Sequence, residues 1–565
     1  MADEHDPIDS AHQGIDATGA TVTPPVPDAP AASPAPAAPA VAAVAAKRPA
    51  APAPRQASHA YPVSGSAPSW TGRRVGIGTA LGRVALVLAF LFGGLALGAG
   101  YWQVIESANL SSSPDDAAVI AAARNVLRGE IFDRDGVRLA WNKRDKNGEP
   151  YRVYASNALS PVLGYASRQY GSTGLENAWN AQLNGVISAD PLRELTRKFR
   201  ADPSDPQDLR TTLVLKLQQA AVAALGKNRG AIVMLDPRNG EVLALVSTPT
   251  FDASAIANPA TATSTFDKLR TDDRRPLLPR ATAGLYVPGS IFKIVTAVAG
   301  LGSGAINPGT TYADQPAGEK SGWLVGGFRV RDGHHTATGT KALNFEEAIE
   351  VSCNIYFAET GVRTGGQALA DWAGRMGFGE KIPFDLPTAT SQVTNSGGSF
   401  GGGFTDRVEL ANAAYGQGET LVTPLQMALV AATIANDGTL MQPHLVLEAT
   451  GKSGTTTIQP TAMERVVAPG IASEIGAAMR LAVSGNLGRI FTAGAAVRGL
   501  AVAGKSGTAE LDPGTKPHSW FIGFAPYDNP QVAIAVLVEN SGGGTVKASP
   551  IAGDLFAAWR DWVNG

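Results

Sequence analysis

The chain has 565 residues, more than one hydrophobic core usually supports, so its length predicts two or three regions. Its formal net charge of -2 gives no general reason to expect a nucleic acid as partner. The single cysteine, Cys353, excludes an intramolecular disulfide and a metal site built on several cysteines.

Two different segments are predicted before the folded part. Residues 1–75 are rich in alanine and proline and poor in large apolar side chains, so we expect a disordered tail. Residues 84–105 carry no charge and have about the length that crosses a bilayer. Arginines precede this run, and Tyr101 and Trp102 lie at its far end. The positive-inside rule then places the N-terminus in the cytoplasm and the rest of the chain outside.

A cleaved signal peptide is the alternative to this transmembrane signal-anchor helix. Small residues at positions 96–100 would suit cleavage. The preceding segment is far longer than a normal signal-peptide n-region, which favours the anchor. The sequence therefore predicts a single-pass membrane protein whose larger part works outside the cytoplasm, where ATP is scarce.

In the part predicted to be exported, the expected secondary-structure elements become longer near residue 211. Residues 106–210 contain short elements: a hairpin that turns at Asp135-Gly136 and a short helix over 174–185. Longer elements follow, first a helix and two strands and then a helix-rich stretch. Strands and a final helix complete the chain. These later elements are expected at 217–226, 230–236, 241–247, 289–438, 499–511, 518–526, 531–540 and 549–563. The order of elements predicts an α+β fold: an antiparallel sheet flanked by helices. In this sheet the first strands of the domain are expected to pair with the last.

Residues Gly499–Ser506 match the pattern of a phosphate-binding loop, G-x-x-x-x-G-K-[ST]. Such a loop needs a glycine-rich bend between a strand and a helix. Here the intervening Leu-Ala-Val-Ala favours a strand, and Pro513 soon interrupts any following helix. We therefore expect residues 500–508 to be a strand and reject an ATPase. A second copy of the letters GKSGT, at 451–455, is expected in an exposed hairpin loop.

Ser290 and Lys293 form the only S-x-x-K pattern in the chain and open an apolar helix. Residues three apart share a helix face, and a desolvated lysine can take the proton of a serine nucleophile. The alternative is an N-cap serine with a solvated lysine. Lys293 lies between Phe292 and Ile294, which favours a partly buried lysine.

Such a site needs further polar groups. Of three S-x-N triplets, the one at Ser107 lies beside the predicted membrane helix and the one at Ser484 in a glycine-rich loop. Ser352 and Asn354 lie at the junction of two helical segments and are the better candidates. Lys505, on a strand edge beside small residues, would attract the terminal carboxylate of an extended peptide.

Taken in order, these residues resemble the three motifs of penicillin-binding proteins and serine β-lactamases. The motifs are Ser290-x-x-Lys293, Ser352-x-Asn354 and Lys505-Ser506-Gly507-Thr508, with Ser506 in place of the commoner threonine. The segments at 128–140 and 174–185 resemble the membrane-proximal pedestal of class B penicillin-binding proteins. The resemblance implies a pedestal (dimerisation-like) domain over 106–210 and a β-lactamase/transpeptidase-like domain over 211–565. The segment over 106–210 is too short for a glycosyltransferase domain. The resemblance therefore implies a monofunctional peptidoglycan D,D-transpeptidase.

The resemblance also implies roles for the motif residues. Ser290 would attack the bond between two terminal D-alanines and form an acyl-enzyme, with Lys293 as base. Ser352 would pass a proton towards the leaving amine, and Asn354 would hold Lys293 and the substrate amide. Lys505 would support the proton network and the substrate carboxylate.

Substrate binding is expected at the third motif. The hydroxyls of Ser506 and Thr508 would lie near the carboxylate, and Gly507 completes this substrate-binding stretch. The backbone N–H groups of Ser290 and Thr508 would form the oxyanion hole.

The resemblance implies several partners and no cofactor or metal. Expected ligands are peptidoglycan stem peptides and β-lactams, and a polytopic membrane glycan polymerase is the expected protein partner. A division role and an elongation role both remain open. His334-His335 is interpreted as a loop, and Cys353 as a packed small hydrophobe.

Three other classes of protein are alternatives to a transpeptidase. A penicillin sensor should have several membrane spans. A class A β-lactamase should have a Glu-x-x-Leu-Asn stretch, which the sequence lacks. A non-enzymatic scaffold should have lost a motif.

Overall fold

The computed structural model describes residues 127–185, 205–332, 341–487 and 492–565, together with 86, 88, 91 and 92. Two compact units, Met1–Gly94 and Leu95–Gly565, make up the chain, and every element below belongs to the second. Within the described ranges no helix is both long and apolar enough to cross a membrane. The predicted tail over 1–75 and, apart from those four residues, the predicted helix over 84–105 lie outside the described residues.

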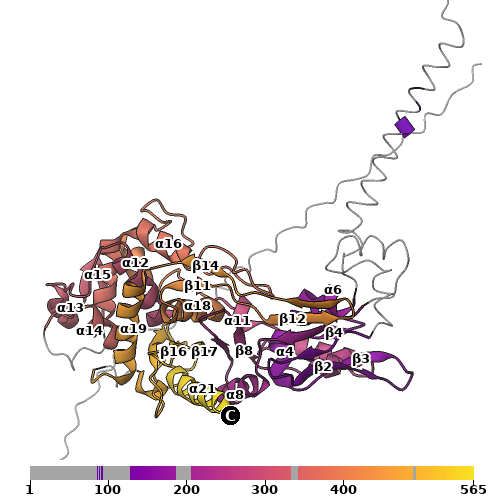
Figure 1. Cartoon of the computed structure of the whole chain (residues 1–565). Coiled ribbons are helices and arrows are strands. Elements are labelled where there is room, and N and C mark those ends of the chain that lie inside the picture. Colours follow the sequence, from indigo (N-terminus) through magenta and orange to yellow (C-terminus); the bar gives the residue numbers. More distant parts are fainter. Residues whose placement is uncertain are drawn as a thin grey trace, which may run out of the picture. The chain divides into compact units, whose positions relative to one another are not determined.

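The main sheet has five antiparallel strands in the order β15-β16-β17-β7-β8 (Figure 1). Their bounds are Ala503–Ala509, His518–Ala525, Val532–Val538, Gly230–Leu235 and Val242–Thr248. Strand β7, early in the domain, pairs antiparallel with β17, late in the domain. This pairing confirms the prediction that the first strands of the sheet pair with the last. Strand β15 lies at the edge of the sheet.

Both faces of this sheet are covered, which explains why its strands are apolar almost throughout. Helices α8 (Leu215–Leu225) and α21 (Ala548–Val563) pack on one face, both where the sequence predicts helices. Helix α18 (Pro424–Ala435) packs on the other face, and all of its residues are buried.

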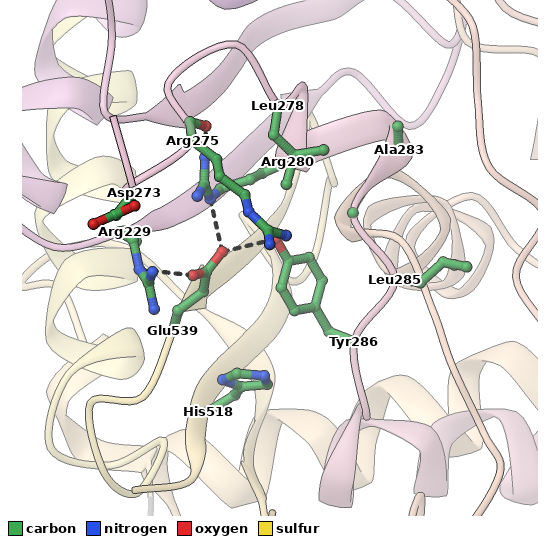
Figure 2. Close-up of a pocket in the computed structure, with 11 residues that line it drawn as sticks. Arg229, Asp273, Arg275, Leu278, Arg280, Ala283, Leu285, Tyr286, His518 and Glu539 are labelled. Carbon is green, nitrogen blue, oxygen red and sulfur yellow. Dashed lines mark hydrogen bonds and ion pairs between the residues drawn. The ribbon is translucent and has the colours of Figure 1, made fainter. Parts of the chain in front are cut away.

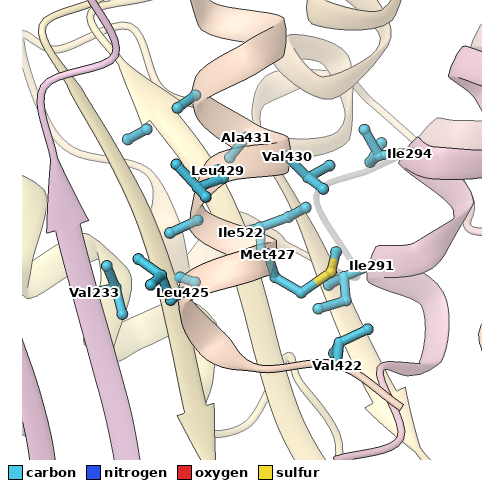
Figure 3. Close-up of a cluster of buried hydrophobic side chains, with 14 of the residues drawn as sticks. Val233, Ile291, Ile294, Val422, Leu425, Met427, Leu429, Val430, Ala431 and Ile522 are labelled. Atoms are coloured by element: carbon cyan, nitrogen blue, oxygen red, sulfur yellow. The ribbon is translucent and has the colours of Figure 1, made fainter. Parts of the chain in front are cut away.

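Helix α18 lies in the core between the sheet and the residues that follow Ser290 (Figure 3), while the edge strand β15 contacts the Ser290 segment directly. Leu425 and Leu429 lie towards the sheet residues Val233 and Ile522, while Met427 and Val430 lie towards Ile291 and Ile294. Burying each such side chain contributes roughly 1.5–3 kcal/mol. The packing fixes the helix that follows Ser290 relative to the sheet.

The helices of the middle region surround this core. They are η3 (Gly289–Phe292), α12 (Lys293–Gly302), α13 (Gln315–Ser321), α14 (Phe345–Glu350), α15 (Asn354–Thr364), α16 (Gly366–Arg375), α17 (Arg407–Ala414) and α19 (Pro469–Ser484). Shorter elements connect them: α9 (Ala253–Ala257), α10 (Ala262–Arg270), α11 (Arg280–Ala283), β9 (Trp323–Val325), β10 (Phe328–Val330), β11 (Thr439–Met441), β14 (Ala462–Arg465) and η5 (Ala493–Ala495).

A second, six-stranded sheet has the order β13-β12-β6-β1-β2-β3. Its strands are Gly454–Thr457, Val446–Gly451, Asp208–Thr211, Ile131–Phe132, Arg138–Arg144 and Pro150–Tyr154. Strands β1 and β2 form the hairpin predicted at Asp135-Gly136. The remaining elements beside it are η2 (Asn157–Leu159), α4 (Ser160–Leu163), β4 (Ala166–Ser167) and β5 (Gly171–Ser172).

The helix predicted over 174–185 is in fact two short helices, α5 (Gly174–Ala178) and α6 (Asn180–Leu183). They meet at Trp179, whose backbone leaves the helical conformation. The Trp179 indole donates a hydrogen bond to Asp385 Oδ1 at 2.8 Å, a tertiary contact that local periodicity does not reveal.

The two GKSGT copies have different environments. The copy at 451–455 spans the tip of the antiparallel hairpin β12–β13, where most of its side chains are exposed, as predicted. The copy at 504–508 lies inside β15, and its strand leads to another strand without an intervening helix. The copy at 504–508, which matches the phosphate-loop pattern, therefore has no phosphate-loop geometry.

Candidate active site

Three segments far apart in the sequence bring their motif residues together. Lys293 Nζ lies 2.7 Å from Asn354 Oδ1 and 3.3 Å from Ser352 Oγ. Lys505 Nζ lies 2.7 Å from the same Ser352 Oγ. Ser290 lies one turn before Lys293, at the N-terminal end of the apolar helix. Hydrogen bonds thus join four of the five residues predicted as catalytic, and the fifth, Ser290, precedes Lys293 by one turn.

The segment before Ser290 fits tightly against the edge of the sheet. Gly289 has a positive φ of 59°. A Cβ at this position would lie 2.4 Å from the carbonyl oxygen of Thr508, a contact that real side chains do not make. Glycine is therefore needed here for two reasons, the left-handed backbone and the close approach to β15.

Ser352 lies in the short connection between helices α14 and α15. Its φ of 63° is left-handed, which is uncommon for a residue with a side chain and is found at functional sites. The Sγ of the next residue, Cys353, accepts a hydrogen bond from the backbone N–H of Tyr356 and so caps helix α15. Cys353 is fully buried, as predicted, although the sequence did not indicate its capping contact.

Lys293 is fully buried, so the alternative of a solvated lysine is wrong. Its Nζ also lies 2.5 Å from the Ser352 carbonyl oxygen. Burial lowers the pKa of Lys293 from 10.5 to about 8, with the nearby Asp332 carboxylate acting in the opposite direction. A lysine of this kind is partly unprotonated near neutral pH and can act as a base.

Lys505 is buried as well, and it shares the hydroxyl of Ser352 with Lys293. Burial, with the positive charge of Lys293, lowers the pKa of Lys505 well below its usual value. Its Nζ also donates to the carbonyl oxygen of Ser506 at 2.9 Å. Ser352 Oγ therefore bridges two buried amines, which is the geometry of a proton relay.

Asp332 is a charged neighbour that the sequence analysis missed. Its carboxylate accepts hydrogen bonds from the backbone N–H groups of Asn354 and Ile355, at the start of α15. The same negative charge raises the pKa of both buried lysines against the effect of burial. A lone aspartate in a loop has no periodicity or spacing that could have indicated this position.

Ser290 itself is half-buried. Among the described residues its hydroxyl accepts and donates no hydrogen bond, and it does not cap its helix. The N-cap interpretation of this serine is therefore wrong. The hydroxyl remains available to an incoming group.

The third motif lies on the edge strand β15, beside the Ser290 segment. Because β15 is an edge strand, its outer backbone groups pair with no other strand of the described sheet. Ser506 is buried, whereas the Thr508 side chain is exposed and its hydroxyl accepts from the Gly544 N–H at 3.2 Å. A Cβ on Gly507 would lie 3.0 Å from Ile291 Cγ2 and from the Pro288 carbonyl oxygen, so glycine lets this strand lie against the Ser290 segment.

His334-His335 lies outside the described residues. His518 begins β16 and is buried, with Nδ1 accepting from the Asn540 N–H at 3.1 Å. In the described part of the chain, no group of three or more histidine, cysteine, aspartate or glutamate side chains could hold a metal ion.

A comparison with protein families gives two matches along the chain. Residues 230–557 match the penicillin binding protein transpeptidase domain, a range that includes all three motifs. Residues 128–205 match the penicillin binding protein A dimerisation domain. The chain belongs to the penicillin-binding protein transpeptidases.

Full-length relatives and solved structures agree with this family. The peptidoglycan D,D-transpeptidase PbpA of Mycolicibacterium smegmatis is 34% identical over 506 residues, covering 85% of this chain and 98% of the relative. The ceftriaxone acyl-enzyme complex of penicillin-binding protein A from Mycobacterium tuberculosis is 30% identical with a TM-score of 0.68, covering 78% of this chain and 99% of that one. Pseudomonas aeruginosa PBP2 in complex with WCK 5153 is 29% identical with a TM-score of 0.66, covering 77% and 96%.

Proposed function

We propose that this penicillin-binding protein cross-links peptidoglycan as a D,D-transpeptidase, with Ser290 as its nucleophile. The observation that carries the proposal is the cluster of two buried lysines around Ser352 beside the unpaired Ser290 hydroxyl. Buried amines with lowered pKa values are expected where a serine must lose its proton. Names of relatives and their acyl-enzyme structures support the same chemistry.

In the first half-reaction Ser290 Oγ attacks the carbonyl carbon between two terminal D-alanines. Unprotonated Lys293 takes the hydroxyl proton, and the Ser352 hydroxyl delivers its own proton to the leaving amine and regains one from the Lys293 ammonium, 3.3 Å away. The bond between the carbonyl carbon and that nitrogen breaks, D-alanine leaves, and an ester to Ser290 remains. The amine of a second stem peptide then attacks the ester, an amide forms, and the Ser290 hydroxyl regains its proton.

The edge of β15 is proposed to hold the donor peptide. Its free backbone groups can pair with an extended peptide, as in other strand-addition modes of recognition. The Ser506 and Thr508 hydroxyls and the Lys505 amine supply donors for the terminal carboxylate. The N–H groups of Ser290 and Thr508 would stabilise the oxyanion.

A β-lactam should react with the same serine. Opening of the lactam ring leaves the former leaving group attached to the acyl part, so no small product departs to make room for an acceptor. The acyl-enzyme is therefore expected to persist.

The location and partner of the enzyme are part of this proposal. The uncharged run over 84–105, preceded by arginines, supports a single-pass anchor in a bacterial cell membrane with the catalytic domain outside. The pedestal over 106–210 and the transpeptidase domain over 211–565 would follow it. A polytopic membrane glycan polymerase is the proposed partner, because cross-linking needs freshly made strands.

Transfer to an amine distinguishes this activity from simple hydrolysis. Incubating the protein with a peptide ending in D-alanyl-D-alanine and an isotope-labelled amine should release D-alanine and form a labelled amide, detected by mass spectrometry. Hydrolysis without any labelled amide, together with rapid release of hydrolysed penicillin, would contradict the transpeptidase and favour a β-lactamase.

A further inference from the structure

The segment that leads to Ser290 lies beside a cavity of about 420 Å³ (Figure 2). Residues 283–286 line one side of it, and Arg229, Arg280, His518 and Glu539 are among the side chains around the rest. On its other side the segment is held by backbone hydrogen bonds: Tyr286 and Val422 exchange two, at 3.0 and 2.9 Å, and the Gly289 N–H donates to the Gly416 carbonyl oxygen at 2.8 Å. Side chains around the cavity supply the further contacts that orient the segment.

Glu539 provides the main anchor in the cavity. It follows strand β17, and its side chain is only 9% exposed. Its Oε1 accepts from Arg280 Nε at 2.7 Å and from the Tyr286 hydroxyl at 2.8 Å, while Oε2 pairs with Arg229 Nε at 3.0 Å. The three donors surround one carboxylate, as Figure 2 shows.

Tyr286 connects Glu539 to the segment that leads to Ser290. Its ring meets those of His518 and Trp520 edge-on, with centroids 5.4 and 6.2 Å apart. The Trp520 indole donates to the Val287 carbonyl oxygen at 3.0 Å. Burial and the neighbouring Glu539 raise the pKa of Tyr286, so its hydroxyl stays protonated and can donate at any working pH.

We infer that Tyr286, held by Glu539, is a positioning residue for Ser290. The hydrogen bond from the Tyr286 hydroxyl adds a side-chain anchor, four residues before the nucleophile, to the backbone bonds between Tyr286 and Val422. A displacement of about 1 Å at a reacting group can cost a hundredfold in rate. This inference rests on the proposed function of Ser290.

The pedestal contains a matched control. There Glu176 is buried and pairs with Arg128 and Arg152, and its Oε1 accepts from the Tyr154 hydroxyl at 3.3 Å. Tyr154 is 8% exposed and Tyr286 9%, and burial raises the pKa of both. The Tyr154 hydroxyl also accepts from the Ala166 N–H at 2.8 Å. Replacement by phenylalanine therefore removes one buried hydrogen bond at Tyr286 and two at Tyr154, so the control loses at least as many.

The test compares Tyr286→Phe with Tyr154→Phe in the full chain. For acylation by a β-lactam, the non-covalent dissociation constant and the first-order acylation rate constant are measured separately. We expect Tyr286→Phe to lower the rate constant about tenfold and to leave the dissociation constant within about twofold of the wild type. Tyr154→Phe should change neither, although both variants should melt at somewhat lower temperature.

Equal acylation rate constants in the two variants would overturn the positioning role. Hydrogen exchange gives a second measurement that does not depend on activity: the amides of residues 284–287, 289 and 290 should exchange faster in Tyr286→Phe and not in Tyr154→Phe. Unchanged exchange there would also overturn the inference. Acylation that persists in Ser290→Ala would instead refute the proposed nucleophile, so the two failures are distinguishable.

Discussion

Replacing Lys293 by methionine is expected to slow acylation by a β-lactam by at least about a hundredfold, the usual lower range for loss of a general base. Methionine keeps most of the buried volume and removes the amine that contacts Ser352 and Asn354. Stopped-flow measurement of the acylation rate constant checks the result. Lys216→Met, on the exposed side of α8, is the control and should retain the full rate.

The pH dependence tests the same base in the unaltered protein. Because the pKa of Lys293 is lowered to about 8, its unprotonated fraction grows as pH rises through that value. The acylation rate should therefore rise about tenfold between pH 7 and pH 9 and then level off. The residual rate of Lys293→Met should lack this rise. Retention of the rise in the variant would assign the titrating base to another group, such as Lys505.

Replacing Gly289 by alanine is expected to lower the acylation rate constant about a hundredfold. The new Cβ would lie 2.4 Å from the Thr508 carbonyl oxygen, so the Ser290 segment must withdraw from the strand proposed to supply half of the oxyanion hole. The measurement is again the first-order acylation rate constant, together with the melting temperature.

Gly304 supplies the control for this substitution. Its φ of 73° is also left-handed, but a Cβ there meets nothing within 4 Å. Both alanine variants therefore carry a backbone cost of roughly 1–2 kcal/mol, and only Gly289→Ala carries the clash. An equal loss of activity in both variants would contradict the role given to close packing at Gly289.

Local sequence patterns predicted much of this fold and indicated which residues belong to the candidate site. The spacing of Ser290 and Lys293, the helix junction at Ser352 and the small residues after Lys505 are all local signals. Most strands of the main sheet are continuous apolar runs bounded by turns, so the runs and the turns identified them. The sequence predicted that β15 starts at Leu500, three residues before its observed start at Ala503. The strand starts later because Gly499 has a positive φ and an isolated bridge joins Val497 to Leu500.

Contacts between distant segments were not predictable in the same way. Asp332 acts through the helix start at Asn354, and Tyr286 acts through Glu539, which lies 253 residues further along the chain. Neither residue has a neighbour in sequence that indicates its partner. The depth of burial of Lys293 also depends on the packing of α12 against other helices, which one helix's apolar pattern only suggests.

The most direct test of the central claim is to locate the covalent adduct formed with penicillin. The full chain is incubated with the drug, denatured, digested and mapped by mass spectrometry. We predict one adduct, on the peptide that contains Ser290, which survives denaturation and is absent from Ser290→Ala. Ser303→Ala, at the other end of helix α12, should be labelled like the wild type. An adduct on another residue, or undiminished labelling of Ser290→Ala, would contradict the account.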